Sequence, residues 1–174
     1  GITENNRLRL SHFSTGESSG QSLPPLRLRK LGVGLQPPVL LADEAPFTVL
    51  IENGLMAERI DVQTGATQWR VRLGSPLVNP RETTALTTTA LFATADGIVK
   101  RFALLDGRSE WQRDLGEGSW RIVEATELSL LALGTMEEGE SSRTELVLCD
   151  SRSGHLVQRI RFAGRVNFDD VQVG

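Results

Sequence analysis

The chain has 174 residues, of which 39% are hydrophobic and 24% are charged, and its formal net charge is −3. This composition is typical of a globular domain with one buried core, and it excludes an intrinsically disordered chain. The acidic balance offers no basic field for nucleic acid, and no apolar run approaches the roughly 20 residues of a membrane-spanning helix.

Short strands separated by tight turns begin near residue 47. Residues 47–51, Phe-Thr-Val-Leu-Ile, are apolar and rich in β-branched side chains, which favours a strand. Asn53-Gly54 follows and is a strong hairpin signal, because both residues tolerate positive φ. Residues 55–61 are the expected return strand, Thr64-Gly65 is a second turn, and residues 68–73 form a further strand.

The same order recurs in the next forty residues. Residues 90–94 lead into a hairpin turn at Asp96-Gly97, residues 98–104 return, Asp106-Gly107 turns, and residues 110–115 close the unit. No segment of this region has the apolar spacing of a helix longer than a turn or two. The chain is therefore predicted to be all-β.

A third unit follows with one difference. Its strands are predicted at residues 128–133, 144–149 and 156–162, with a turn at Ser153-Gly154. An acidic hairpin loop that includes Glu137-Glu138-Gly139-Glu140 is expected between the first two of them. An additional first strand for each unit is predicted at three short segments, Val39–Leu41, Leu77–Val78 and Trp120–Val123.

Three segments match one another in register, and this repeat is the main evidence for the fold. Asp61–Trp69, Ala103–Trp111 and Asp150–Gln158 align so that Gly65, Gly107 and Gly154 are 42 and 47 residues apart. A fainter copy, His12–Gly16, precedes them. A period in the forties built from four short strands is typical of a β-propeller, in which each unit is one blade. The fold class is therefore a partial β-propeller of about three to four four-stranded antiparallel blades.

Apolar and basic residues alternate in the last strand of each unit. Trp69, Val71 and Leu73 are expected on one face and Arg70 and Arg72 on the other, with a similar alternation over residues 159–162. The fourth strand of a blade is its outer edge, where charged side chains discourage edge-to-edge pairing. These arginines are therefore interpreted as edge protection rather than as a binding patch.

The pattern Asp-x-x-Thr-Gly-x-x-x-Trp at residues 61–69 resembles the repeat of the quinoprotein-like, or pyrroloquinoline-quinone-type, β-propellers. The resemblance covers residues 36–162, although Ala103 replaces the usual Asp in the second unit and Gln158 replaces the usual Trp in the third. It implies that the Gly adopts a turn conformation and that the Trp packs between neighbouring blades. The repeat positions assigned this structural role are Asp61, Gly65, Trp69, Gly107, Trp111, Asp150 and Gly154.

Members of the family divide into dehydrogenases and non-catalytic scaffolds. The dehydrogenases carry an adjacent-cysteine ring, calcium ligands and a catalytic Asp, whereas Cys149 is the single cysteine of this chain. Neither the acidic segment 137–140 nor Asp169-Asp170 has the spacing of a calcium loop, and the two histidines occupy unrelated repeats. We therefore predict no catalytic residue, no metal ligand and no cofactor.

The predicted blades are residues 36–76, 77–117 and 118–163. Residues 1–35 are an incomplete N-terminal blade and connection, and residues 164–174 begin a further blade or close the ring. A fragment of a larger ring is one interpretation, and a small four-bladed ring closed by residues 8–13 and 166–171 is the alternative. Bare faces of terminal blades would favour self-association.

The expected function is a non-catalytic binding or scaffold module that mediates protein–protein interaction. Its alternatives are a fragment of a quinone-dependent dehydrogenase and a sensor or carbohydrate-binding module of a larger bacterial protein. Residues 1–4 show no signal-peptide pattern, and only the family resemblance favours a location outside the cytoplasm. Expected partners are proteins rather than nucleic acid.

Overall fold

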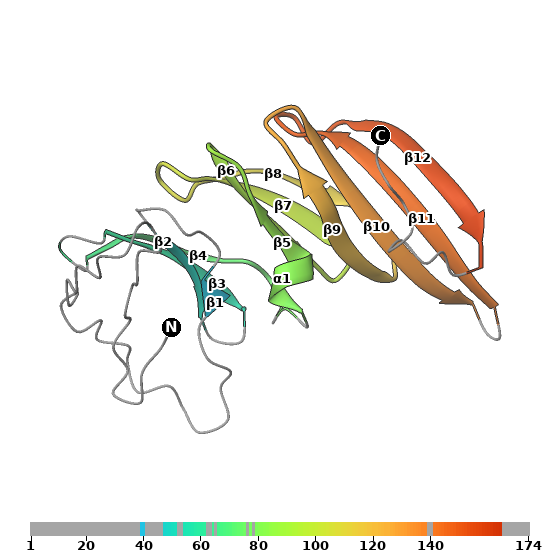
Figure 1. Ribbon diagram of the computed structural model, residues 1–174, viewed down its shortest axis with the longest axis horizontal. Helices are drawn as coiled ribbons and strands as arrows, with labels where there is room; N and C mark the ends of the chain where they lie inside the picture. The colour runs from blue at the N-terminus through green and yellow to red at the C-terminus, as the bar shows by residue number, and fades with distance from the viewer. Residues whose placement is uncertain are drawn as a thin grey trace, which may run out of the picture.

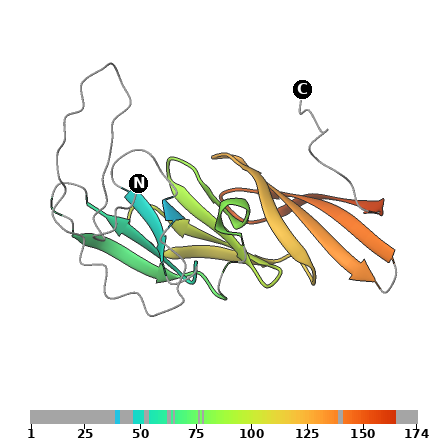
Figure 2. The same ribbon diagram turned by 60° about the horizontal axis from the view of Figure 1, so that its bottom comes forward.

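The computed structural model describes residues 39–40, 47–51, 54–61, 64, 66–75, 77, 79–138 and 141–164. These residues form three four-stranded antiparallel sheets, which follow one another in chain order along the long axis of the molecule (Figure 1). The turned view shows the same succession (Figure 2). The predicted fold class is confirmed.

Each sheet is built from four consecutive strands of the chain. The first sheet contains β1 (Val39–Leu40), β2 (Phe47–Ile51), β3 (Met56–Ile60) and β4 (Thr67–Arg72), paired in that order. The second contains β5 (Thr84–Leu86), β6 (Ala90–Ala95), β7 (Ile98–Ala103) and β8 (Ser109–Asp114). The third contains β9 (Ser119–Ala125), β10 (Ser129–Glu138), β11 (Ser141–Asp150) and β12 (Leu156–Ala163).

The hairpin between β6 and β7 has the turn that its sequence predicts. Asp96 and Gly97 have φ values of 52° and 74°, so both central residues lie in the left-handed region that a two-residue hairpin turn requires. In the first sheet Gly54 also has a positive φ of 74°, whereas Asn53 lies outside the described residues. Gly54 and the Asp96-Gly97 pair therefore lie at the ends of these hairpins with the positive φ that their turns require.

The three sheets also share a register irregularity between their third and fourth strands. The pairing shifts after Arg59↔Trp69, after Arg101↔Trp111 and after Leu148↔Gln158. At each shift the fourth strand carries one extra residue, which is the pattern of a β-bulge. Because the bulges fall at equivalent positions, they place the residue after each bulge on the same face of every sheet.

Two cores lie between the sheets, and we call them the first seam and the second seam. The first seam joins the first and second sheets through Ala57, Trp69, Leu73, Leu77, Leu91, Ala93, Phe102 and Leu104. The second seam joins the second and third sheets through Ala90, Phe92, Val99, Leu115, Trp120, Ile122, Leu130, Ala132, Met136, Val147 and Cys149. The middle sheet therefore contributes apolar residues to both seams.

The predicted first strand of the second unit is wrong. Leu77 is buried but is not in a strand, Val78 lies outside the described residues, and the first strand of the second sheet is β5. The helix α1 (Pro80–Thr83), a single turn, precedes β5. Pro80 occupies the start of this turn, where the fixed φ of proline suits a helix and its missing N–H costs nothing.

The predicted acidic loop of the third unit is also wrong. Glu137 and Glu138 belong to β10, which pairs with β11 through the whole register from Ser129↔Asp150 to Glu138↔Ser141. Only residues 139 and 140 of the expected loop lie outside the described residues. Cross-strand pairing over ten residues outweighs the weak strand preference of glutamate.

The arginines of the fourth strand have different surroundings in the first and third sheets. In β4, Trp69 is buried and Arg70 and Arg72 are exposed, as predicted. In β12, however, Arg159 and Arg161 form ion pairs with the buried Glu145, whereas Ile160 is 38% exposed. These ion pairs give the two arginines a second role, and their interpretation as edge protection stays a prediction.

Candidate functional site

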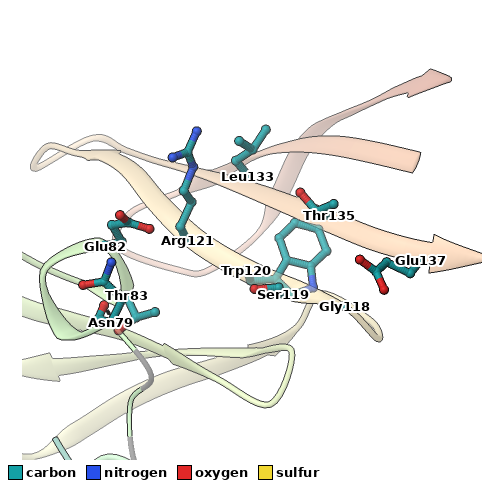
Figure 3. A pocket seen from close by; sticks show the side chains of 10 residues that line it. All are labelled: Asn79, Glu82, Thr83, Gly118, Ser119, Trp120, Arg121, Leu133, Thr135 and Glu137. Atoms are coloured by element: carbon teal, nitrogen blue, oxygen red, sulfur yellow. Dashed lines mark hydrogen bonds between the residues drawn. The ribbon is translucent and has the colours of Figure 1, made fainter. Parts of the chain in front are cut away.

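An open cleft of about 770 Å³ lies between α1 and the third sheet. Its lining comes from three places: the turn of α1, the start of β9 and the neighbouring part of β10 (Figure 3). The lining residues are Asn79, Glu82, Thr83, Gly118, Ser119, Trp120, Arg121, Leu133, Thr135 and Glu137. Since β9 is the edge strand of its sheet, the cleft lies along a strand edge.

The indole of Trp120 is part of the cleft wall and is held firmly. Trp120 is 5% exposed and packs on the backbone of Gly134 in β10, where an added β-carbon would lie 2.7 Å from the indole Cε2. Its Nε1–H donates a hydrogen bond to the carbonyl oxygen of Gly116 at 3.0 Å. This side of the cleft is therefore rigid. The sequence pattern predicted Trp120 in a first strand but gave no signal for its contact with Gly134.

The opposite wall is α1. The Thr83 hydroxyl donates to the Asn79 carbonyl oxygen at 2.8 Å, and the Thr84 hydroxyl donates to the Pro80 carbonyl oxygen at 2.6 Å. The Asn79 carbonyl oxygen also accepts the backbone N–H groups of Glu82 and Thr83, so the hydroxyl bonds reinforce this single turn. Asn79 and Glu82 are exposed at the surface of this turn.

Three charged residues line the cleft: Glu82 from α1, Arg121 from β9 and Glu137 from β10 (Figure 3). Arg121 is directly opposite Leu133 in the β9–β10 register, so a guanidinium group and an apolar side chain lie on the same face of the sheet. Within the described part of the chain, neither Glu82 nor Arg121 has an ion-pair partner. The cleft thus combines charge of both signs with apolar surface.

The described residues offer neither a cluster of metal ligands nor an activated thiol. None of their His, Cys, Asp and Glu side chains gather in groups of three that could hold a metal ion. Burial raises the pKa of the Cys149 thiol, which is the opposite of what a reactive cysteine requires. Of the helices that the structure describes, none is long and apolar enough to cross a membrane.

Two of the repeat positions assigned from the sequence, Asp61 and Asp150, have equivalent roles in their turns. The Asp61 Oδ1 accepts hydrogen bonds from the backbone N–H and the hydroxyl of Thr64, at 2.8 and 2.9 Å. The Asp150 Oδ1 accepts the same pair from Ser153, at 2.8 and 2.6 Å. The hydrogen bonds from Ser153 lower the pKa of Asp150, so the carboxylate caps its turn in the ionised form.

The two tryptophans of the repeat each lie across a seam. Trp69 donates through Nε1–H to the carbonyl oxygen of Leu104 at 2.8 Å, and Trp111 donates to that of Ser151 at 3.0 Å. Trp69 is buried and packs against Gly107, while Trp111 is partly buried and packs against Gly154. Gly65, the remaining repeat glycine, lies outside the described residues. None of these positions lines the cleft.

A polar contact at the loop end of the second seam was not found from the sequence. Glu127, in the β9–β10 loop, accepts hydrogen bonds from the Thr88 hydroxyl at 2.7 Å and from the Thr89 backbone N–H at 3.1 Å. A bond from the Thr89 hydroxyl at 2.5 Å completes the set. These bonds, from Thr89 first and then Thr88, lower the pKa of Glu127 to about 2. A single Glu in a loop gives no sequence signal for such a contact.

Comparisons with known proteins bear on the fold. No protein-family model matches the chain, and no curated protein matches it. Among solved structures, it is similar to BamB from Moraxella catarrhalis, with a TM-score of 0.51 and 17% identity over 70% of this chain and 37% of that one. It is also similar to a europium-containing methanol dehydrogenase, with a TM-score of 0.51 and 15% identity over 78% of this chain and 27% of that one.

Both of these structures are β-propellers, so the three sheets are blades of a propeller. The chain spans well under two thirds of the length of either structure.

Proposed function

We propose that the chain is part of a non-catalytic propeller scaffold that binds a protein partner at the cleft between α1 and β9. The observation that carries this proposal is the lining of the cleft, where the charged side chains of Glu82, Arg121 and Glu137 lie beside the buried apolar residues Trp120 and Leu133. Protein interfaces combine such charges, which select the partner, with apolar area that supplies affinity. A site on strands is also held more rigidly than one on loops.

The division of the chain into blades at residues 36–76, 77–117 and 118–163 is part of the proposal. It is supported by the membership of the strands, since β1–β4, β5–β8 and β9–β12 form separate sheets. The cleft then lies between the start of the second blade and the start of the third blade. One wall is α1, at the start of the second blade, and the other is β9 with the adjoining part of β10 in the third blade.

The alternatives have less support from the residues of the cleft. A carbohydrate site usually offers the face of an aromatic ring, but the Trp120 ring is packed on Gly134 and is almost fully buried. A quinone dehydrogenase needs carboxylates or amides around a cation and a cofactor. The cleft has two carboxylates, and they come from different elements: Glu82 from α1 and Glu137 from β10.

Site-specific photo-crosslinking tests the proposed cleft. A photoreactive phenylalanine analogue at Ser119, an exposed cleft residue, is expected to give one adduct of defined mass in the native host. The same analogue at Arg152, exposed in the β11–β12 turn outside the cleft, is the matched control. An adduct that forms equally at both positions, or at neither, would contradict the proposal.

Calorimetry separates the scaffold from the dehydrogenase interpretation. Pyrroloquinoline quinone titrated into the purified chain in the presence of calcium is expected to give no saturable heat. Binding at micromolar affinity with 1:1 stoichiometry would instead favour the dehydrogenase. Loss of that binding in the Glu82→Lys variant would then place the cofactor in the cleft.

A further inference from the structure

An unusual group of charges lies at the outer part of the second seam. The Glu145 side chain, on β11, is 2% exposed and contacts three guanidinium groups. Arg143 Nε lies 3.2 Å from Glu145 Oε1, Arg159 Nη1 lies 3.2 Å from Oε2, and Arg161 Nε lies 2.8 Å from Oε1. A buried carboxylate thus orients several arginines at once.

A further arginine reaches the same region from the second sheet. Arg113 on β8 donates through Nε–H to the carbonyl oxygen of Gly154 at 2.9 Å, and Arg159 donates in the other direction to that of Leu115 at 3.1 Å. Burial raises the pKa of the Cys149 thiol, and the charges of Arg113 and Arg159 partly oppose this rise. Both guanidinium groups therefore lie near the same buried thiol.

The positive charge of this group exceeds its negative charge. Arg159 and Arg161 against Glu145 give 2 − 1 = +1, in a chain whose net charge is −3. Arg143 has further interactions and is left out of this sum. The other partners of Arg113 and Arg159 are neutral carbonyl groups, which accept hydrogen bonds without cancelling charge. Among the described residues, Arg159 and Arg161 pair with no carboxylate besides Glu145.

Arg161 is the member of the group that is open to a ligand. Its side chain is 62% exposed, and only its Nε is engaged, by Glu145. The guanidinium is planar and offers paired N–H donors that match two oxygens of a phosphate. A phosphate group carries about −1.5 to −2 charges at neutral pH, so the local excess of positive charge attracts it.

We propose that the arginine cluster, defined as Arg159 and Arg161 around Glu145, binds a phosphate group. Glu145 holds the arginines in place, and the negative charge of the ligand reduces the repulsion between their guanidinium groups. This site and the cleft lie at opposite edges of the third sheet, because the site is on β12 and the cleft is on β9. It is independent of the proposed protein-binding function.

The test is a titration of the purified chain with inorganic phosphate, followed by NMR of the arginine side-chain Nε–H groups. We expect saturable shifts of the Arg159 and Arg161 signals that chloride at the same ionic strength does not reproduce. Arg161→Gln should weaken phosphate binding roughly tenfold, which is the effect of losing one charge-assisted pair. Because Arg161 is largely exposed, this variant is expected to fold.

Arg81→Gln is the control, since it removes the same charge from an exposed residue of α1. It should leave the phosphate affinity unchanged. A second arm uses vesicles with phosphatidic acid in place of inorganic phosphate, which distinguishes a lipid headgroup from a soluble phosphate. Binding of either source that depends on Arg161 supports the site. Binding of neither, or equal binding by wild type and Arg161→Gln, overturns it.

Discussion

The indole of Trp69 lies against the α-carbon of Gly107, so closely that a β-carbon on Gly107 would be 2.9 Å from the indole Cγ and Cδ2. The two residues belong to neighbouring sheets and to successive copies of the repeat. The same relationship recurs one sheet later between Trp111 and Gly154, at 2.7 Å. The Trp of each repeat is therefore complementary to the Gly of the next.

Replacing Gly107 with alanine tests this contact. Gly107 has a φ of 73°, so alanine would be strained there and would also collide with the Trp69 ring. We expect Gly107→Ala to lower the free energy of unfolding by roughly 2–4 kcal/mol. Gly116→Ala is the matched control, because Gly116 has a φ of 98° but no atom within 4 Å of the added carbon. Equal losses in urea denaturation would mean that the indole contact contributes nothing.

Removal of the tryptophans should have unequal effects. Trp69→Ala is expected to cost about 3–5 kcal/mol, because Trp69 is 7% exposed and leaves a cavity in the first seam. Trp111 is only partly buried, so Trp111→Ala should cost less. Gln158→Ala is the control at the equivalent position of the third sheet, where the side chain is exposed and a change within about 0.5 kcal/mol is expected. A larger loss for Trp111 than for Trp69 would contradict this order.

The Glu127 contact predicts a dependence of stability on pH. The pKa of Glu127 is about 2 in the folded chain and 4.5 ordinarily, so the unfolded chain binds more protons between these values. Its contribution to stability is therefore present above pH 4.5 and is lost as the pH falls towards 2.

Denaturant unfolding of wild type and Glu127→Gln over this pH range measures the effect. The two proteins should differ most above pH 4.5 and converge at the acidic end. Glu124→Gln, an exposed residue of β9, is the control and should keep a constant difference from wild type. A Glu127→Gln curve that parallels wild type at every pH would disprove the role of the threonine hydrogen bonds.

Glu145 is predicted to be the most sensitive carboxylate of the third sheet. Glu145→Gln removes the carboxylate that three arginines share and is expected to cost about 3 kcal/mol. Adding Arg161→Gln should recover part of the loss, since it removes one of the repelling charges. Chemical denaturation of the single and double variants gives this coupling, and strictly additive losses would show that Glu145 acts by packing alone.

The local features of the fold were predictable from the sequence because they depend on neighbouring residues. Asp96-Gly97 specifies its hairpin through positive φ, and Asp150 caps its turn three residues before Ser153. The alternation in β4 follows from the two faces of a strand, and the repeat spacing follows from the length of one sheet. These signals predicted the order of the elements and the class of the fold.

Other features depend on pairs that only the tertiary structure brings together. The acidic residues of β10 extend a strand because β11 pairs with them, and α1 and β5 replace a predicted strand at Leu77–Val78. The cleft joins Glu82 and Arg121 from different sheets, and Glu127 reaches Thr88 across 39 residues of sequence.

Burial decides the remaining cases. The sequence determined that β12 alternates between arginines and apolar residues, but not which face each set occupies. The third sheet places Glu145 in the second seam, and the cost of an isolated buried charge draws Arg159 and Arg161 towards it. Periodicity thus fixed the two faces of each strand, whereas the packing of one sheet on another decided which face became interior and where the charged sites lie.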